Sequence, residues 1–162
     1  MKKYTFKIYP AGRCREAYRV IEMAGEKTLE NLCEYILECF DFTDEHLYEF
    51  CMDNKMYSEY SYEYNPEDDD SATVIKIDKI GLVKGQNFSL HYDYGDDWMF
   101  TIHVNKIEET NASVESKLIK SKGKVEQYPS WEDWEILKKM TRFRCRRYNY
   151  EGEIQMKAEK IF

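Results

Sequence analysis

Residues 86–107 read Gln-Asn-Phe-Ser-Leu-His-Tyr-Asp-Tyr-Gly-Asp-Asp-Trp-Met-Phe-Thr-Ile-His-Val-Asn-Lys-Ile. Large apolar side chains recur at every second position on both sides of a central acidic turn, at Phe88, Leu90 and Tyr92 and again at Trp98, Phe100, Ile102 and Val104. A period of two places alternate side chains on one face of a β-strand. The stretch therefore predicts a hairpin with strands over 86–92 and 98–107.

The N-terminal part predicts two further strands and a helix. Alternation over 4–9 and an apolar run over 17–23 each favour a strand. Thr28 is the expected N-cap of a helix that reaches Phe40. Its buried stripe is expected at the i, i+3, i+4 positions Leu29, Leu32, Cys33, Ile36, Leu37 and Phe40.

The remaining segments are less regular. Residues 46–52 predict a strand, and 73–82 favour a short helix in spite of their β-branched residues. Ser130 with Asp133 resembles a helix-capping box, and 142–146 alternate like an amphipathic strand. Together these elements predict one α+β domain over 1–162, with helices packed on a largely antiparallel or mixed sheet.

Composition excludes several classes of protein. Hydrophobic residues make up 43% and charged residues 34% of 162, which is typical of a globular domain. No signal peptide or membrane span is visible, so no membrane partner is expected. Five scattered cysteines without a C-x-x-C pair favour reduced thiols in the cytoplasm and disfavour a structural zinc site.

The net charge of −7 is unevenly distributed. Residues 1–116 contain 12 Lys and Arg against 24 Asp and Glu, whereas 117–162 contain 12 against 7. Two interpretations follow. The basic part folds back onto the acidic body, or it forms a local surface for a polyanion.

Several short motifs occur in a characteristic order. They are Tyr18-Arg19, Thr28-Leu29, His46-Leu47-Tyr48-Glu49-Phe50 and Tyr92-Asp93-Tyr94-Gly95-Asp96-Asp97-Trp98. This combination resembles the plasmid pRiA4b ORF-3-like family, and the turn motif is its most specific part. The resemblance covers about residues 4–108 and leaves 109–162 as a divergent, basic C-terminal part.

The resemblance implies an α+β fold and an association with plasmids and transposons, and it implies no established activity. It adds weight to Tyr18, Arg19, His46, Leu47, Phe50, Tyr92, Gly95 and Trp98 as family-motif residues. Family members often carry a glycine-rich segment with cysteines near the C-terminus. Here that region reads Tyr-Pro-Ser-Trp-Glu-Asp-Trp over 128–134, without cysteine or glycine.

The acidic turn is a candidate metal site. Asp93, Asp96 and Asp97 offer carboxylates to a hard divalent cation, and His91 and His103 on the paired strands offer nitrogen. The alternative is a structural turn, in which Gly95 supplies a positive φ and aspartates bond their own backbone. A partner-binding surface is the third possibility, and no cofactor is otherwise expected.

Other catalytic arrangements find less support. His46 at a strand end is typical of a structural histidine, although the family motif includes it. Cys51 and His46 are five residues apart, so a regular strand would place them on opposite faces. No phosphate-binding glycine loop, G-x-S-x-G or H-E-x-x-H motif occurs.

The stretch 138–150 interleaves basic and aromatic residues, as single-stranded nucleic-acid binding uses. Its candidate contacts are Arg142, Arg144, Arg146, Arg147 and Tyr148. The alternative is the protected outer face of an edge strand.

These observations favour a non-catalytic interaction domain with a protein or nucleic-acid partner. A metal-dependent enzyme acting on phosphate esters through Asp93, Asp96 and Asp97 is the alternative. The oligomeric state leaves no signal in the sequence.

Overall fold

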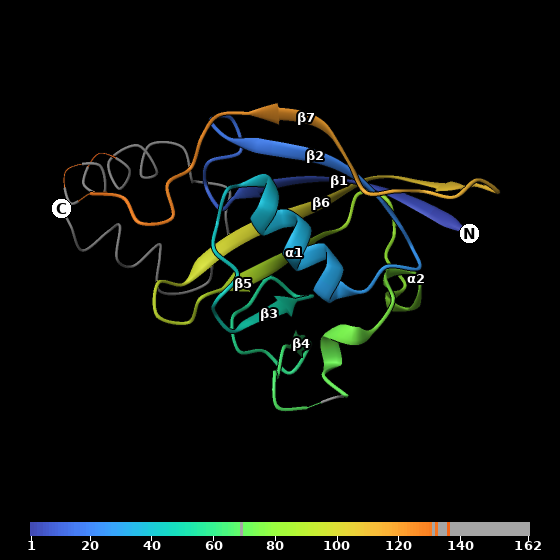
Figure 1. Ribbon diagram of the computed structural model, residues 1–162, viewed down its shortest axis with the longest axis horizontal. Helices are drawn as coiled ribbons and strands as arrows, with labels where there is room; N and C mark the ends of the chain where they lie inside the picture. Colours follow the sequence, from blue (N-terminus) through green and yellow to red (C-terminus); the bar gives the residue numbers. More distant parts are fainter. Residues whose placement is uncertain (69, 131, 133–135, 137–162) are drawn as a thin grey trace.

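The computed structural model describes residues 1–68, 70–130, 132 and 136. Seven strands form one sheet in the order β4-β3-β5-β6-β1-β2-β7 (Figure 1), and every pairing is antiparallel. The strands are β1 (Lys2–Pro10), β2 (Tyr18–Ala24), β3 (Tyr48–Cys51), β4 (Ser61–Glu63), β5 (Asn87–Tyr92), β6 (Trp98–Glu109) and β7 (Lys117–Lys122). The sheet is therefore antiparallel, and the mixed alternative is wrong for these strands.

The predicted hairpin is confirmed as β5 and β6. Leu90 lies opposite Phe100, and Tyr92 lies opposite Trp98. β6 continues past the hairpin and pairs along its length with β1, which places the N-terminal strand in the middle of the sheet. The apolar faces of β1, β5 and β6 provide a large part of the core.

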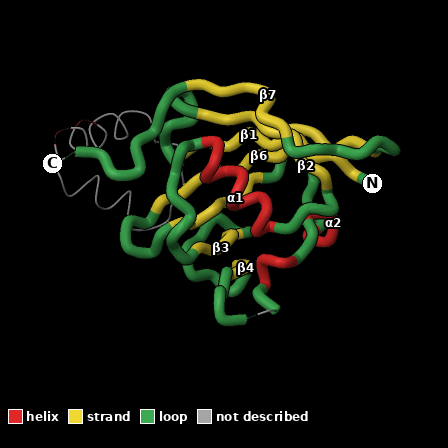
Figure 2. Tube along the Cα trace, in the orientation of Figure 1, coloured by secondary structure: helices red, strands yellow, loops and turns green. Residues whose placement is uncertain are grey.

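Helix α1 (Leu29–Cys39) lies across one face of the sheet (Figures 1 and 2). Thr28 is its N-cap, as predicted, and forms a reciprocal capping box with Asn31. The predicted apolar stripe is buried against the sheet from Leu29 to Phe40. Among the described residues α1 is the one long helix, so the expected helical layer is confirmed in this element.

The helix expected over 73–82 is only partly present. A 3₁₀ turn, η1 (Ala72–Val74), and a single helical turn, α2 (Ile77–Ile80), flank an extended Ile75 and Lys76. The Ile75 carbonyl accepts the Leu29 N–H at 3.2 Å, and the Ile77 N–H donates to the Lys27 carbonyl at 2.9 Å. Pairing with the segment before α1 thus interrupts the helix.

The opposite face of the sheet is covered in part by the loop between β3 and β4. The Asn54 side chain donates to the Asn87 carbonyl at 3.2 Å and accepts from Ser89 Oγ at 2.7 Å. The helix predicted behind Ser130 and the strand predicted over 142–146 lie almost wholly outside the described residues.

Candidate functional site

The family turn between β5 and β6 is built on Asp93. Asp93 Oδ1 accepts the N–H groups of Gly95 at 3.0 Å and of Asp96 at 3.3 Å, and the side chain is largely buried. The Asp97 N–H donates to the Asp93 carbonyl at 2.6 Å. This is the self-capping that aspartates perform in turns.

The expectation that Gly95 supplies a positive φ is wrong. The left-handed residues are Asp93, with φ of 63°, and Asp97, with φ of 51°. A Cβ at Gly95 would instead lie 3.2 Å from Asp93 Oδ1. The absence of a Cβ at Gly95 therefore avoids a tight contact with the capping carboxylate.

A second set of contacts forms a turn cluster of Glu49, His91 and Asp97. His91 Nδ1 lies 2.8 Å from Glu49 Oε1, and His91 Nε2 lies 2.7 Å from Asp97 Oδ1. The side chains of His91 and Glu49 are fully buried, and that of Asp97 is 38% exposed. A carboxylate beside each ring nitrogen favours the doubly protonated imidazolium form of His91, in which both nitrogens donate.

The pKa values agree with this charge state. Burial by itself lowers the pKa of His91, but the hydrogen bonds to Glu49 and Asp97 outweigh it and raise the pKa above its ordinary value. Burial raises the pKa of Glu49, yet the hydrogen bonds from His91 and the Tyr57 N–H bring it below its ordinary value. The turn cluster is thus a buried ion pair of His91 and Glu49, extended by a second, partly exposed carboxylate on Asp97.

Two tyrosines cover this cluster. The ring centroids of Tyr57 and Tyr94 lie 5.2 Å and 4.9 Å from that of His91. The Tyr57 N–H also donates to Glu49 Oε1 at 2.7 Å. His91 therefore holds together β3, β5, the turn and the loop after β3, and its imidazole is closed to a metal ion.

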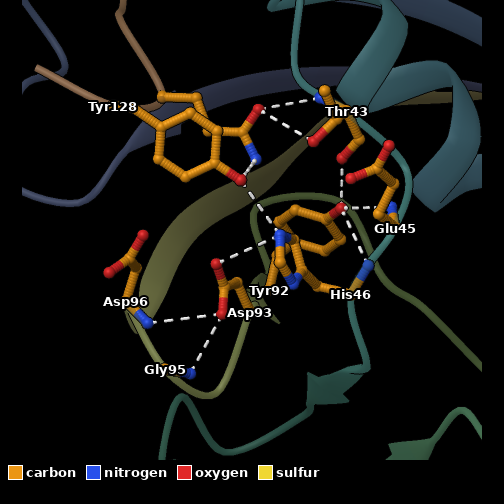
Figure 3. A network of polar contacts seen from close by, with 9 residues as sticks. Thr43, Glu45, His46, Tyr92, Asp93, Gly95, Asp96 and Tyr128 are labelled. Carbon is orange, nitrogen blue, oxygen red and sulfur yellow. Dashed lines mark hydrogen bonds and ion pairs between the residues drawn. The ribbon is translucent and has the colours of Figure 1, made fainter.

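On the other side of the turn, His46 forms a separate network (Figure 3). His46 Nε2 lies 3.5 Å from Asp93 Oδ2 and 3.0 Å from the Tyr128 hydroxyl. Gln127 Oε1 accepts the Thr43 N–H at 2.8 Å. These contacts dock the segment after β7 onto the family motif.

Tyr92 is the centre of this network. Its hydroxyl donates to the Thr43 carbonyl and accepts the N–H groups of Glu45 at 3.0 Å and His46 at 3.3 Å. The ring is fully buried. The buried Tyr92 hydroxyl thus provides hydrogen-bond partners for three backbone groups of the loop between α1 and β3.

The five candidate metal ligands do not converge. Asp93 is bound to the turn backbone, and His91 is bound on both nitrogens. His103 lies opposite Asn87, four residues along the hairpin from His91, and its Nδ1 contacts Asn87 Oδ1 at 2.5 Å. Four strand residues span about 13 Å. Among the described residues, no three His, Cys, Asp or Glu side chains form a group that could hold a metal ion.

No hydrogen bond or ion pair joins the described residues Cys51 and His46. Cys51 is fully buried, and burial followed by the charge of Glu49 raises the pKa of its thiol. A thiol held neutral is a poor nucleophile. Cys14, Cys33, Cys39 and Cys51 are all free, while Cys145 lies outside the described residues.

Of the other family-motif residues, Arg19, Phe50 and Trp98 have structural roles. Arg19 is buried on the helix side, where its Nε donates to the Cys39 carbonyl at 2.8 Å and its Nη1 to the Lys122 carbonyl at 2.8 Å. Phe50 is a core residue, and Trp98 packs on Phe42 with centroids 4.8 Å apart. Leu47, in contrast, is 45% exposed.

A basic sheet face lies on the side away from α1, and we define it by Lys7, Tyr18, Lys120 and Lys122. In register, Lys7 and Lys120 both lie opposite Val20, and Tyr18 lies opposite Lys122. Directly paired residues project from the same face of a sheet. Lys7 Nζ is 4.6 Å from the centroid of the Tyr18 ring, and Lys120 Nζ is 5.6 Å from it.

The charge on this face is not neutralised by the described residues. Lys7, Lys120 and Lys122 form no ion pair with a described carboxylate. A hydrogen bond from Lys120, with the charges of the other two lysines, lowers the pKa of the Tyr18 hydroxyl. The three lysines therefore make this part of the face positively charged.

Three features of these sites escaped the sequence interpretation. The buried charge of Glu49 could have been found from its position within the otherwise apolar strand 48–51. The exposed strand 117–122 could have been found from its lysines. Tyr128 carried no local signal, because its contact with His46 is tertiary. Arg142, Arg144, Arg146, Arg147 and Tyr148 lie outside the described residues, so their role remains a prediction.

No helix among the described residues is both long and apolar enough to span a membrane. No curated protein is significantly similar to the chain in sequence. A crystal structure of a protein of unknown function, MM3350 from Methanosarcina mazei Go1, is similar with a TM-score of 0.67 at 21% identity. The alignment covers 99% of this chain and 89% of that one, which shows a shared fold.

The family model described as plasmid pRiA4b ORF-3-like protein matches residues 2–142. The match extends beyond the 4–108 over which the motifs were identified and includes β7 and Tyr128. Family membership adds no established reaction or ligand. The chain belongs to the plasmid pRiA4b ORF-3-like family.

Proposed function

We propose that this chain is a non-catalytic binding domain that holds single-stranded nucleic acid on its basic sheet face. The observation that carries the proposal is the position of Lys7 and Lys120 beside the Tyr18 ring on one face of the sheet, where neither lysine forms an ion pair with a described carboxylate. Lysines neutralise backbone phosphates, and a tyrosine on a sheet offers a surface on which a base can stack.

The surroundings support the same ligand. β7 is an edge strand whose six residues are all exposed, and it brings Lys120 and Lys122 beside Lys7 of β1. The chain as a whole carries a net charge of −7, so binding depends on this local surface. The predicted cytoplasmic location and the association of the family with mobile elements are compatible with such a ligand, and both remain predictions.

The test is fluorescence anisotropy of a labelled oligothymidylate of about 12 nucleotides, within the usual range for single-strand binding sites. Three phosphate contacts give a salt slope near −2, so we expect affinity to fall about 20-fold between 50 and 200 mM salt. Replacing Lys7, Lys120 and Lys122 by Gln should remove most of the binding.

The matched control replaces Lys76, Lys79 and Lys84 by Gln. These exposed lysines lie in and around α2 and make the same change in net charge. Equal loss of affinity in both triple variants, or binding that does not depend on salt, would contradict the proposal. Undetectable binding to oligothymidylate and to duplexes would favour a protein partner.

Hydrolysis of phosphate esters at the acidic turn is the alternative function. No observation favours it among the described residues, because Asp93 is occupied by the turn backbone and the candidate ligands do not converge. A metal titration followed by thermal unfolding separates the two functions.

A further inference from the structure

An acidic cleft lies at the opposite edge of the sheet, where β4 is the last strand. The cleft has a volume of about 340 Å³, and its walls include Leu47, Tyr64, Pro66, Tyr94, Glu63 and Glu67. It contains two tyrosine rings, two carboxylates and two apolar side chains. Among the described residues, no lysine or arginine contributes to its wall.

The two rings are held in place by neighbouring aromatic residues. Tyr64 stacks on the buried Tyr48 with centroids 4.7 Å apart and planes within 5°. Tyr94 packs against His91 and Tyr57, at centroid distances of 4.9 Å and 5.5 Å. Rings fixed in this way lose little entropy when a ligand packs on them.

The potential in the cleft is negative. Glu63 and Glu67 are exposed, and neither forms an ion pair with a described lysine or arginine. Burial, followed by the charges of Glu49 and Glu63, raises the pKa of Tyr94, which agrees with a local excess of carboxylates. A cationic group is the chemical complement of this cleft.

We propose that the acidic cleft binds an arginine side chain of a partner protein. A guanidinium stacks on tyrosine rings and donates paired hydrogen bonds to carboxylates, whereas an ammonium is more strongly hydrated and does not stack. Leu47, 45% exposed, and Pro66 provide apolar surface for the methylene stem of the arginine. The site is separate from the basic sheet face and uses none of its residues.

The test is a two-dimensional NMR titration of the ¹⁵N-labelled full chain with acetyl-Gly-Arg-Gly-amide. We expect saturable shifts centred on the amides of Leu47, Tyr64 and Tyr94. The same peptide with citrulline, which has nearly the shape of arginine without its charge, should bind about tenfold more weakly, which corresponds to about 1.4 kcal/mol. The lysine peptide should also be weaker than the arginine peptide.

The variant that tests the cleft carries Glu63→Gln and Glu67→Gln, and it should weaken arginine binding about tenfold. Its control carries Glu26→Gln and Glu115→Gln, which make the same charge change in a different cleft, near Met1.

Equal affinity for arginine and citrulline, equal affinity for arginine and lysine, or an equal loss in both variants would each overturn the proposal. Shifts spread over the surface without saturation would do so too. None of these outcomes affects the nucleic-acid proposal, which is measured at the other edge of the sheet.

Discussion

His91 is a fully buried histidine with a carboxylate on each ring nitrogen, at 2.8 Å and 2.7 Å. Its pKa is raised, so its stabilising contribution is complete below the ordinary value of 6.5 and is lost as the pH rises through the folded-state pKa. The pKa of Glu49 is lowered, so its contribution is present above 4.5 and is lost as the pH falls through the lowered pKa. The turn cluster therefore stabilises the folded protein most between pH 4.5 and pH 6.5, the ordinary pKa values of Glu49 and His91.

We predict that His91→Gln lowers the free energy of unfolding by about 2 to 3 kcal/mol at pH 6. This is less than the usual loss for a broken buried pair, because Asp97 is 38% exposed and partly screened by water. The difference from the unmutated protein should shrink at pH 9. Urea unfolding at both pH values measures it.

The control is His103→Gln, which removes a partly exposed histidine from the same hairpin and should change stability by less than about 0.5 kcal/mol. A pH-independent loss at His91 would show that the imidazole contributes packing and no charge.

Asp93 and Asp96 are neighbours in the turn with different roles. Asp93 caps the turn at a positive φ, whereas the Asp96 side chain makes no hydrogen bond with a described residue. Asp93→Ala should cost about 2 kcal/mol of stability and Asp96→Ala less than about 0.5 kcal/mol. Thermal unfolding of the two variants measures this difference.

The same assay tests the metal alternative. Addition of Mg²⁺, Mn²⁺, Ca²⁺ or Zn²⁺ to the unmutated protein should leave its Tm unchanged. A metal ion at about 100 times its Kd would add about 2.7 kcal/mol, which is easily detected. A metal-specific rise that disappears in Asp96→Ala would restore the enzyme hypothesis.

At the scale of elements, a buried arginine connects β7 to the end of α1. Arg19 donates to the Cys39 carbonyl at the end of α1 and to the Lys122 carbonyl at the end of β7. Among the described strands β7 pairs with β2 alone, and all its side chains are exposed. Little apolar burial is therefore available to hold it.

Arg19→Met keeps most of the apolar stem and removes the donors. We expect amide hydrogen exchange over 117–122 to accelerate about tenfold or more, while β1 and β6 remain protected. Arg13→Met is the control, since Arg13 forms its ion pair with Glu16 in the loop before β2. Uniform acceleration throughout the sheet would mean that Arg19 supports the global fold and not this strand.

Elements with local signals were predictable. The capping box and apolar stripe of α1 and the alternation of β5 and β6 each depend on residues close in sequence. The helix expected over 73–82 was interrupted because the backbone of Ile75 and Ile77 pairs with Leu29 and Lys27. Strands β4 and β7 were missed because they are short or wholly exposed and show no apolar alternation.

At the scale of the whole molecule, the order of the strands separates two surfaces of opposite charge. The acidic cleft lies by β4 at one edge of the sheet, and the basic sheet face reaches β7 at the other. The sequence predicted the charge asymmetry, and within the described residues part of the basic third folds back onto β2. The two proposed ligands, one anionic and one cationic, follow from this separation.

The sequence alone determined the family, the helix α1, the central hairpin and the turn motif, because motif order, periodicity and capping are encoded by residues near one another. The tertiary structure decided what the motif residues contact: it closed His91 between Glu49 and Asp97, and it placed His46 against Tyr128. It also brought Lys7 of β1 beside Lys120 of β7 around the Tyr18 ring. Such contacts join strands distant in the chain, and only the strand order and register of the folded sheet set the distances between them.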